Sequence, residues 1–205
     1  TTGTGAVDPL RAIGEICRRH DIYLHVDAAW AGTAMLLEEH RGMIDGIELA
    51  DSFVFNPHKW MFTNFDCSAH FIRDSDAVVK TLSILPAYLQ SRETGSVIDY
   101  RDWSVPLGRR FRALKLWFVI RSYGVDGMKA MLRQQIGWAE DLEKTIVAEP
   151  EVELLVPRSL TLLTFRWKPT GMTDEAGLDA FNEKLVHAVN DDGRLYLTQT
   201  HTKGH

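Results

Sequence analysis

The stretch Ser52-Phe53-Val54-Phe55-Asn56-Pro57-His58-Lys59-Trp60 decides how the first part of the chain folds. An apolar run with alternating aromatic residues ends at an Asn-Pro corner, and a single lysine follows a histidine. Short β-rich runs closed by Asn-Pro are typical of a buried strand that leaves the sheet into a loop. A lysine at such a strand end can be desolvated, which disfavours the ammonium and frees the amine to form a Schiff base. Lys59 is therefore the first candidate catalytic residue.

A second candidate lies upstream, where residues 22–27 are predicted to form a strand that ends at Asp27. Open α/β sheets bind ligands beyond the carboxyl ends of their strands, so Asp27 and Lys59 can face one ligand. The pair suits pyridoxal phosphate, because the lysine holds the aldehyde carbon as an imine and the carboxylate keeps the pyridine nitrogen protonated. From spacing alone, an Asp27–Lys59 ion pair or two unrelated strand-end residues is the simpler explanation.

The order of helices and strands predicts an α/β architecture. An amphipathic helix over residues 9–20 precedes the first strand, and the following alternation of strands and helices favours a largely parallel sheet. Two long helices follow, separated at Gly124. The last quarter is predicted to add two strands, a helix and a strand over 194–199, which suggests a smaller α+β unit. We expect domains at residues 1–148 and 149–205.

Composition argues against several classes of partner. The chain has 205 residues and a net charge of −5, and only Arg109-Arg110-Phe111-Arg112 concentrates basic residues, so neither nucleic acid nor a membrane surface is an expected partner. No apolar run approaches the ~20 residues of a spanning helix, and no signal peptide is apparent. Cys17 and Cys67 lie far apart in apolar patterns, which favours free thiols in a reducing, cytoplasmic compartment.

The chain end offers one pattern that resembles a metal site. His201 and His205 have a spacing that can ligate a metal ion on a helix, but Gly204 argues against a helix there. We therefore expect no metal. The chain begins at Thr1 without a methionine and stops shortly after a predicted strand, so we expect it to be truncated at both ends.

Two segments carry a family resemblance. His25-Val26-Asp27-Ala28-Ala29-Trp30-Ala31-Gly32 and Asn56-Pro57-His58-Lys59-Trp60 resemble the signature segments of the pyridoxal-phosphate-dependent group II decarboxylases, and are most similar to the aromatic L-amino acid (tyrosine, DOPA, tryptophan) decarboxylases. The likeness covers most of residues 1–135 and is weaker beyond 150. Further matching blocks are Asn64-Phe65-Asp66-Cys67-Ser68, Asp99-Tyr100-Arg101-Asp102-Trp103 and Val105-Pro106-Leu107-Gly108-Arg109-Arg110-Phe111-Arg112.

The resemblance implies a fold and an assembly. The fold would be the fold-type-I, pyridoxal-phosphate-dependent transferase-like one, with residues 1–148 as the C-terminal part of the large domain and residues 149–205 as part of the small domain. The enzyme would be a homodimer that takes a small amino acid substrate.

The resemblance also implies roles at the site. Lys59 would be the Schiff-base lysine, Asp27 would pair with the pyridine nitrogen, and Ala29 would pack on the ring face. His58 would handle a proton or orient groups beside the imine.

Two further residues, Asn56 and Thr2, would hydrogen-bond the cofactor. Plainer explanations exist for three of the site residues. Asn56 shapes the corner before the proline, His58 is a structural histidine, and Thr2 is a loop hydroxyl that faces water.

Tyr88 bears on the type of reaction. The resemblance matches Leu85-Pro86-Ala87-Tyr88-Leu89 to a catalytic loop whose tyrosine returns a proton after carbon dioxide leaves, a step for which positioned proton transfer supplies ~10²–10⁴-fold. Relatives with phenylalanine there tend toward aldehyde formation. The plainer explanation is an exposed loop tyrosine. Trp30 and Phe65 are candidates for an aromatic substrate pocket, although core packing explains both equally well.

These observations predict decarboxylation of an aromatic L-amino acid to its amine. Trp60 and the block Asp99-Tyr100-Arg101 favour this group over decarboxylases of glutamate, histidine or a sulfinate, which remain the alternative. A further alternative is an inactive fragment, because phosphate-binding residues and a ring-stacking histidine of the family lie in an N-terminal part that precedes these residues.

Overall fold

The computed structural model describes residues 2–83 and 97–201, and the chain divides into two compact units. One unit is Pro9–Lys129, and the other joins Thr1–Asp8 to Ala130–His205. This division lies inside a long helix rather than at its end. The domain boundary expected near residue 148 stays a prediction.

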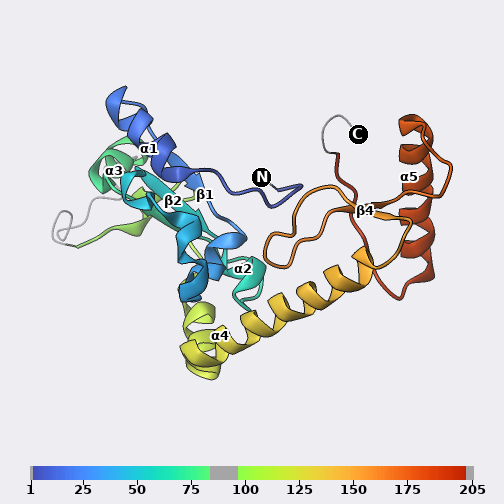
Figure 1. The fold of residues 1–205 in the computed structure, drawn as a ribbon. Coiled ribbons are helices and arrows are strands. Elements are labelled where there is room, and N and C mark those ends of the chain that lie inside the picture. The colour runs from blue at the N-terminus through green and yellow to red at the C-terminus, as the bar shows by residue number, and fades with distance from the viewer. Residues whose placement is uncertain (1, 84–96, 202–205) are drawn as a thin grey trace. The chain divides into compact units, whose positions relative to one another are not determined.

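A three-stranded sheet forms the centre of the Pro9–Lys129 unit (Figure 1). Its order is β1 (His25–Asp27), β2 (Ser52–Phe55) and β3 (Ala69–Ile72). The expected parallel pairing is confirmed for β1 and β2, but β3 runs antiparallel to β2, so the sheet is mixed rather than mostly parallel. The connection from β2 to β3 holds only the single-turn helix α2 (Pro57–Trp60), and not the longer helix that usually forms the crossover between parallel strands.

Helices pack beside this sheet. The amphipathic helix α1 (Leu10–Arg19), predicted from its apolar period, packs against the 3₁₀ helix η3 (Ile47–Leu49). A Cβ on Gly14 would lie 2.7 Å from the Cβ of Leu49, so only glycine allows this close approach. The other helices in this unit are α3 (Ser75–Leu82), η1 (Ala31–Leu36), η2 (Glu38–Ile44) and η5 (Tyr100–Trp103).

The core of this unit is small and lies between the sheet and the loops that follow β1 and β2. Leu37 and Met128 are almost completely buried, and Trp60 anchors α2 by burying its ring. The indole rings of Trp30 and Trp60 stack with centroids 5.1 Å apart. The remaining buried apolar residues of the unit are Val26, Ala34, Ala50, Met61 and Cys67.

Helix α4 (Arg112–Val147) contains the break that its sequence predicts. Gly124 has φ 67° and ψ 165°, which is outside the helical region, so two helical segments meet there. A positive φ is accessible to glycine at little cost because it has no Cβ.

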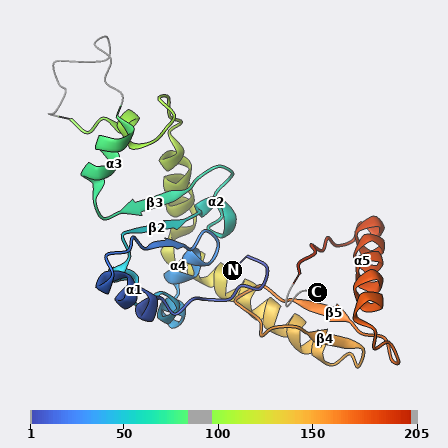
Figure 2. The ribbon, with the colours of Figure 1, turned by 90° about the horizontal axis from the view of Figure 1, so that it is seen from above.

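The second unit contains the C-terminal segment of α4, a two-stranded sheet and the helix α5 (Figure 2). Strands β4 (Val152–Leu154) and β5 (Phe165–Trp167) pair antiparallel, and α5 (Glu175–Asp192) follows. The carboxylate of Asp174 accepts a hydrogen bond from the Gly177 N–H at 2.8 Å, so Asp174 caps α5.

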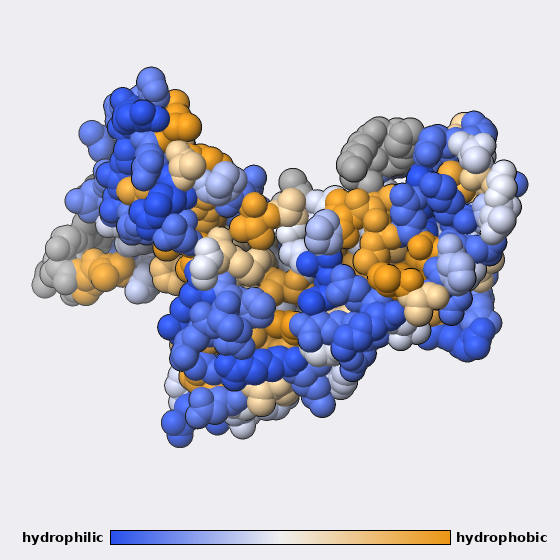
Figure 3. Space-filling view, viewed as in Figure 1, coloured by the Kyte–Doolittle hydropathy of each residue, from blue (hydrophilic) through white to orange (hydrophobic). Residues whose placement is uncertain are grey.

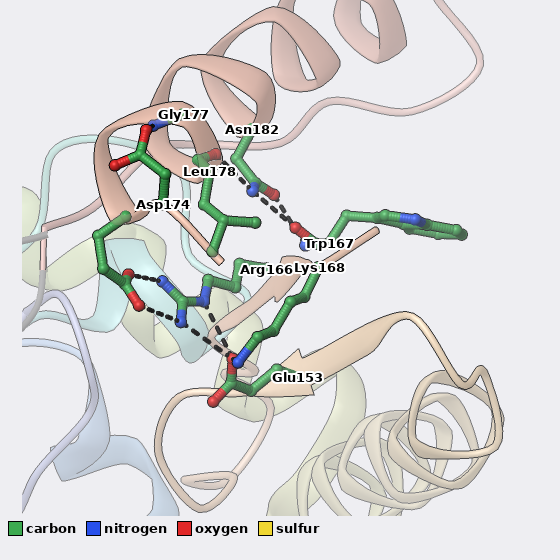
Figure 4. A network of polar contacts seen from close by, with 9 residues as sticks. Glu153, Arg166, Trp167, Lys168, Asp174, Gly177, Leu178 and Asn182 are labelled. Carbon is green, nitrogen blue, oxygen red and sulfur yellow. Dashed lines mark hydrogen bonds and ion pairs between the residues drawn. The ribbon is translucent and has the colours of Figure 1, made fainter. Parts of the chain in front are cut away.

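An ion-pair network joins α5 to this sheet (Figure 4). The guanidinium of Arg166 on β5 contacts Glu153 on β4 at 3.1 Å and Glu175 in the first turn of α5 at 2.6 Å. Lys168 contacts the same Glu153 carboxylate at 3.6 Å. Hydrogen bonding to Glu175 raises the pKa of Arg166, which favours the charged form of the guanidinium.

The strand expected over 194–199 is not present in the structure, which leaves these residues without regular secondary structure. The side chain of Asn190 in α5 makes hydrogen bonds of the kind that a neighbouring strand would make. Its Oδ1 accepts from the Leu197 N–H at 2.7 Å, and its Nδ2 donates to the Leu197 carbonyl at 3.0 Å. This side-chain amide therefore pairs with the backbone N–H and carbonyl of one residue, Leu197, whereas a strand would pair with several residues of the segment.

Asn182 makes the same kind of contact with β5, and its replacement by alanine is expected to destabilise the second unit. Its amide donates to the carbonyls of Trp167 and Leu178 and accepts from the Trp167 N–H, at 2.8, 2.9 and 2.8 Å (Figure 4). Asn182→Ala leaves partly buried backbone groups unpaired, which costs about 1–3 kcal/mol. Hydrogen exchange at the Trp167 amide measures the loss. Lys184→Ala, at an exposed position on α5, is the control, and unchanged protection of the Trp167 amide in Asn182→Ala would contradict the prediction.

The visible surface mixes hydrophilic and hydrophobic residues (Figure 3). Large apolar side chains are exposed along the first segment of α4, where Trp117 and Phe118 are 53% and 54% exposed. No helix within residues 2–83 and 97–201 is both long and apolar enough to cross a bilayer.

Candidate active site

The two predicted charged residues lie at the same edge of the sheet. Asp27 ends β1, and Lys59 lies in α2, directly after β2. Because β1 and β2 are parallel neighbours, their carboxyl ends meet at one edge. Backbone pairing continues past the strands, since the Ala28 N–H donates to the Val54 carbonyl at 2.9 Å and the Asn56 N–H donates to the Ala29 carbonyl at 2.8 Å.

The carboxylate of Asp27 is oriented by the loop that follows it. Its Oδ1 accepts a hydrogen bond from the Ala29 N–H at 2.9 Å. Gly32 packs so closely on Phe55 that a Cβ would overlap the phenylalanine Cβ, which holds this loop against the end of β2. The side chain of Asp27 is exposed and thus accessible to a ligand.

Lys59 lies on the single turn of α2, which is anchored by the burial of Pro57 and Trp60 on either side. Its N–H donates to the Asn56 carbonyl at 2.9 Å. The lysine itself is exposed, so the desolvation expected from the sequence is not provided by the described residues. The single turn of α2 leaves the lysine side chain uncovered at the edge of the sheet.

His58 is held by the backbone of Cys67. The His58 N–H donates to the Cys67 carbonyl at 3.2 Å, and the ring Nδ1 lies 2.7 Å from that carbonyl oxygen and 3.0 Å from the Cys67 nitrogen. The ring of Phe65 meets the imidazole edge to face with centroids 4.8 Å apart. The half-buried imidazole is therefore fixed beside Lys59 in the chain.

The side chain of Asn56 is fixed by Ser68. The Ser68 hydroxyl donates to Asn56 Oδ1 at 2.6 Å. With its oxygen used in this way, the amide keeps its two N–H donors for another group. This arrangement fits the hydrogen-bonding role predicted for Asn56 better than a role in shaping the turn alone.

The structure separates the two aromatic pocket candidates. Trp30 is half-buried and stacks on Trp60, which favours core packing. Phe65 is 82% exposed, so core packing is wrong for this residue.

The structure describes two of the three remaining predicted site residues. Ala29 lies in the loop after β1, half-buried, with its N–H on Asp27. Thr2 belongs to the other compact unit and is exposed, so its role stays a prediction. Tyr88 lies outside the described residues.

Sequence reasoning assigned no role to several residues that support the site. Cys67 holds His58, and Ser68 holds Asn56. Both supporting residues belong to the block Asn64-Phe65-Asp66-Cys67-Ser68, whose only signal in the sequence is the family resemblance. His25 Nδ1 lies 2.6 Å from the Ser52 hydroxyl, and its ring meets that of His70. Burial and the neighbouring His25 lower the pKa of His70.

Comparison with known proteins gives consistent similarities. Residues 1–168 match the pyridoxal-dependent decarboxylase conserved domain. Tyrosine decarboxylase 4 of Petroselinum crispum is 43% identical over 205 residues, covering 98% of this chain and 40% of the relative. Phenylacetaldehyde synthase of Arabidopsis thaliana is also 43% identical, over 100% of this chain and 42% of the relative.

A solved structure gives the same result for the fold. The crystal structure of Oryza sativa TDC with PLP and tryptamine superposes with a TM-score of 0.94 at 35% identity, covering 100% of this chain and 43% of that one. This likeness confirms the α/β, fold-type-I expectation. The chain spans about two fifths of the length of the curated relatives it matches. On the domain match and these similarities, the chain belongs to the pyridoxal-dependent decarboxylase family.

Proposed function

We propose that the full-length protein decarboxylates an aromatic L-amino acid with pyridoxal 5'-phosphate. The observation that carries the proposal is the placement of Asp27 and Lys59 after two neighbouring parallel strands, with His58 and Asn56 held in fixed orientations alongside. When bound, the cofactor supplies an aldehyde that takes up the substrate amine and a ring that accepts the electrons of the bond that breaks.

The residues at this edge fit such a group. Lys59 offers an accessible amine for an aldehyde, and Asp27 offers an oriented carboxylate for a basic ring nitrogen. Ala29 has a side chain small enough for a flat ring to approach. Asn56 keeps its amide donors for polar substituents of the ring.

Each residue then has a defined role. Lys59 would hold the cofactor through its amine. Asp27 would keep a proton on the ring nitrogen, which favours electron withdrawal from the substrate α-carbon. His58 would hold or move a proton near the Lys59 amine, and Asn56 and Thr2 would hydrogen-bond the cofactor.

The proposal for Tyr88 predicts the product. Tyr88 donates a proton to the substrate α-carbon after the carboxylate leaves, so Tyr88→Phe in the full-length protein should lower amine formation by about 10²-fold and raise aldehyde formation. Amine and aldehyde yields measured by chromatography check this. Tyr100→Phe is the control, at a tyrosine that the structure shows to be exposed. An unchanged ratio of amine to aldehyde in Tyr88→Phe would remove Tyr88 from the mechanism.

The aromatic substrate class is supported by the similarity to tyrosine and tryptophan decarboxylases. A second candidate function is oxidative formation of an aldehyde, which the equally similar phenylacetaldehyde synthase favours. A panel of tyrosine, DOPA, tryptophan, phenylalanine, glutamate, histidine and cysteine sulfinate, with amine, aldehyde and carbon dioxide measured for each, separates these candidates. Release of carbon dioxide from none of the seven would contradict the proposal.

The assembly and compartment are also proposals. A homodimer is supported by the exposed aromatic residues Trp117 and Phe118, because monomeric soluble proteins rarely expose large contiguous apolar patches. The free thiols of Cys17 and Cys67 support a reducing compartment, the cytoplasm.

A further inference from the structure

The segment Asn64–Ser68, here called the support segment, contacts two site residues at once. Through the backbone of Cys67 it holds the imidazole of His58, and through the hydroxyl of Ser68 it holds the amide of Asn56. Both site residues belong to the corner that carries Lys59. The orientation of this corner therefore depends on where the support segment lies.

The contact with His58 suits a histidine that changes its protonation state. Nδ1 faces both the carbonyl oxygen of Cys67, at 2.7 Å, and the N–H of Cys67, with nitrogen atoms 3.0 Å apart. A protonated Nδ1 donates to the carbonyl, and an unprotonated Nδ1 accepts from the N–H. The ring thus keeps a partner in the imidazolium and in both neutral tautomers, and it can exchange a proton through Nε2 without leaving its place.

The support segment is itself held by the first turns of α4. Arg112 Nε donates to Asp66 Oδ2 at 2.9 Å, and Lys115 Nζ donates to the Asn64 carbonyl at 3.2 Å. The Cys67 side chain is buried, with its sulfur 3.9 Å from the Arg112 carbonyl. These contacts hold the segment at Asn64, Asp66 and Cys67.

We propose that Asp66 is a positioning residue. Its contact with Arg112 fixes the support segment, and Cys67 of that segment then holds His58 in place beside Lys59. The inference rests on the proposed function and adds to it a residue that contacts neither substrate nor cofactor. The side chains of Asp66 and Arg112 are 30% and 38% exposed, so the role depends on geometry more than on the stability of a buried pair.

A double-mutant cycle in the full-length protein tests whether Asp66 acts through His58. Asp66→Asn should lower kcat about tenfold with KM changed less than about twofold, because contacting networks couple by up to a few kcal/mol. In the His58→Gln background the same change should lower kcat less than about twofold, since the ring it positions is gone. Equal effects of Asp66→Asn in the two backgrounds would overturn the proposal.

A matched control separates positioning from general destabilisation. Asp45 pairs with Arg11 at 2.7 Å in the same unit, away from the sheet edge that carries Lys59. Asp45→Asn should leave kcat and its pH profile unchanged. A decrease in kcat equal to that of Asp66→Asn would show a structural effect alone and would overturn the proposal.

A spectroscopic readout keeps this test independent of activity. The ¹⁵N shifts of the His58 ring, assigned with His58→Gln, report its tautomer and hydrogen bonding in the protein without substrate. Asp66→Asn should change these shifts, and Asp45→Asn should not. If the wild type releases no carbon dioxide, the proposed function fails while this measurement still decides the positioning role, and unchanged ¹⁵N shifts in Asp66→Asn would overturn that role.

The ion pair should persist across the working pH range. The hydrogen bond from Arg112 lowers the pKa of Asp66 below its ordinary value. A lowered folded-state pKa stabilises the pair above the unfolded value near pH 4, and the contribution is lost only as the pH falls through the folded value. The ratio of wild-type to Asp66→Asn kcat should therefore show no step from the titration of Asp66 between pH 6 and 9.

Discussion

Replacing Lys59 by alanine is expected to remove amine formation to below detection and to abolish the visible absorbance band of the lysine-bound cofactor. Lys59 is the only lysine at the sheet edge among the described residues, and its amine is accessible there. Without it, an aldehyde has no covalent attachment next to Asp27, and product release loses the lysine amine that would displace the product amine. Absorbance spectroscopy with added pyridoxal 5'-phosphate, and amine release from the best substrate, measure both losses.

A control lysine makes this result specific. Lys80 lies exposed on α3, and Lys80→Ala should retain the band and the activity. An absorbance band of full strength in Lys59→Ala, or its absence from the wild-type protein, would contradict the assignment of Lys59.

Asp27→Asn is expected to have the second largest effect and to lower kcat at least about 100-fold, the scale on which removal of one preorganised electrostatic group acts. Asparagine keeps an oxygen that can accept the Ala29 N–H, so the loop after β1 should keep its shape. It removes the negative charge that would keep the ring nitrogen protonated. Steady-state kinetics at saturating cofactor measure the loss, and the cofactor band should remain.

Asp51 is the matched control for this substitution. Its carboxylate also accepts a backbone N–H, from Leu24 at 2.8 Å, but just before the opposite end of the β1–β2 pair. Asp51→Asn makes the same chemical change in the same sheet and should leave kcat within about twofold, since surface carboxylates contribute little at a distance. Comparable losses of kcat for the two variants would show that the sheet, and not the Asp27 charge, is the cause.

Local patterns predicted most of the elements near the site. The apolar period of α1 and the glycine break in α4 are confirmed, because each depends on residues close in sequence. The expectation of a largely parallel sheet was wrong for β3, which runs antiparallel to β2. The strand expected over 194–199 was wrong because β propensity does not supply a partner strand, and Asn190 occupies that place.

In the site, too, some residues could be predicted from the sequence and others could not. Asp27 and Lys59 could be predicted because strand ends and corner residues are visible in the sequence, and parallel pairing brings them to one edge. The supports of His58 could not, because the pair Asp66–Arg112 joins residues 46 positions apart and neither has an unusual local pattern. Tertiary contacts of this kind appear only once the fold places the segments together.

The main-chain contact of Cys67 with His58 determines how substitutions at position 67 can act. Since the two atoms that face Nδ1 are a peptide nitrogen and a carbonyl oxygen, no codon change at position 67, proline excepted, deletes them. A substitution there can only disturb the packing of a buried thiol. The support of His58 is therefore encoded by the path of the backbone and not by the identity of the residue that provides it. It can be lost through distant substitutions that move that path, while the residue in contact with the histidine tolerates replacement.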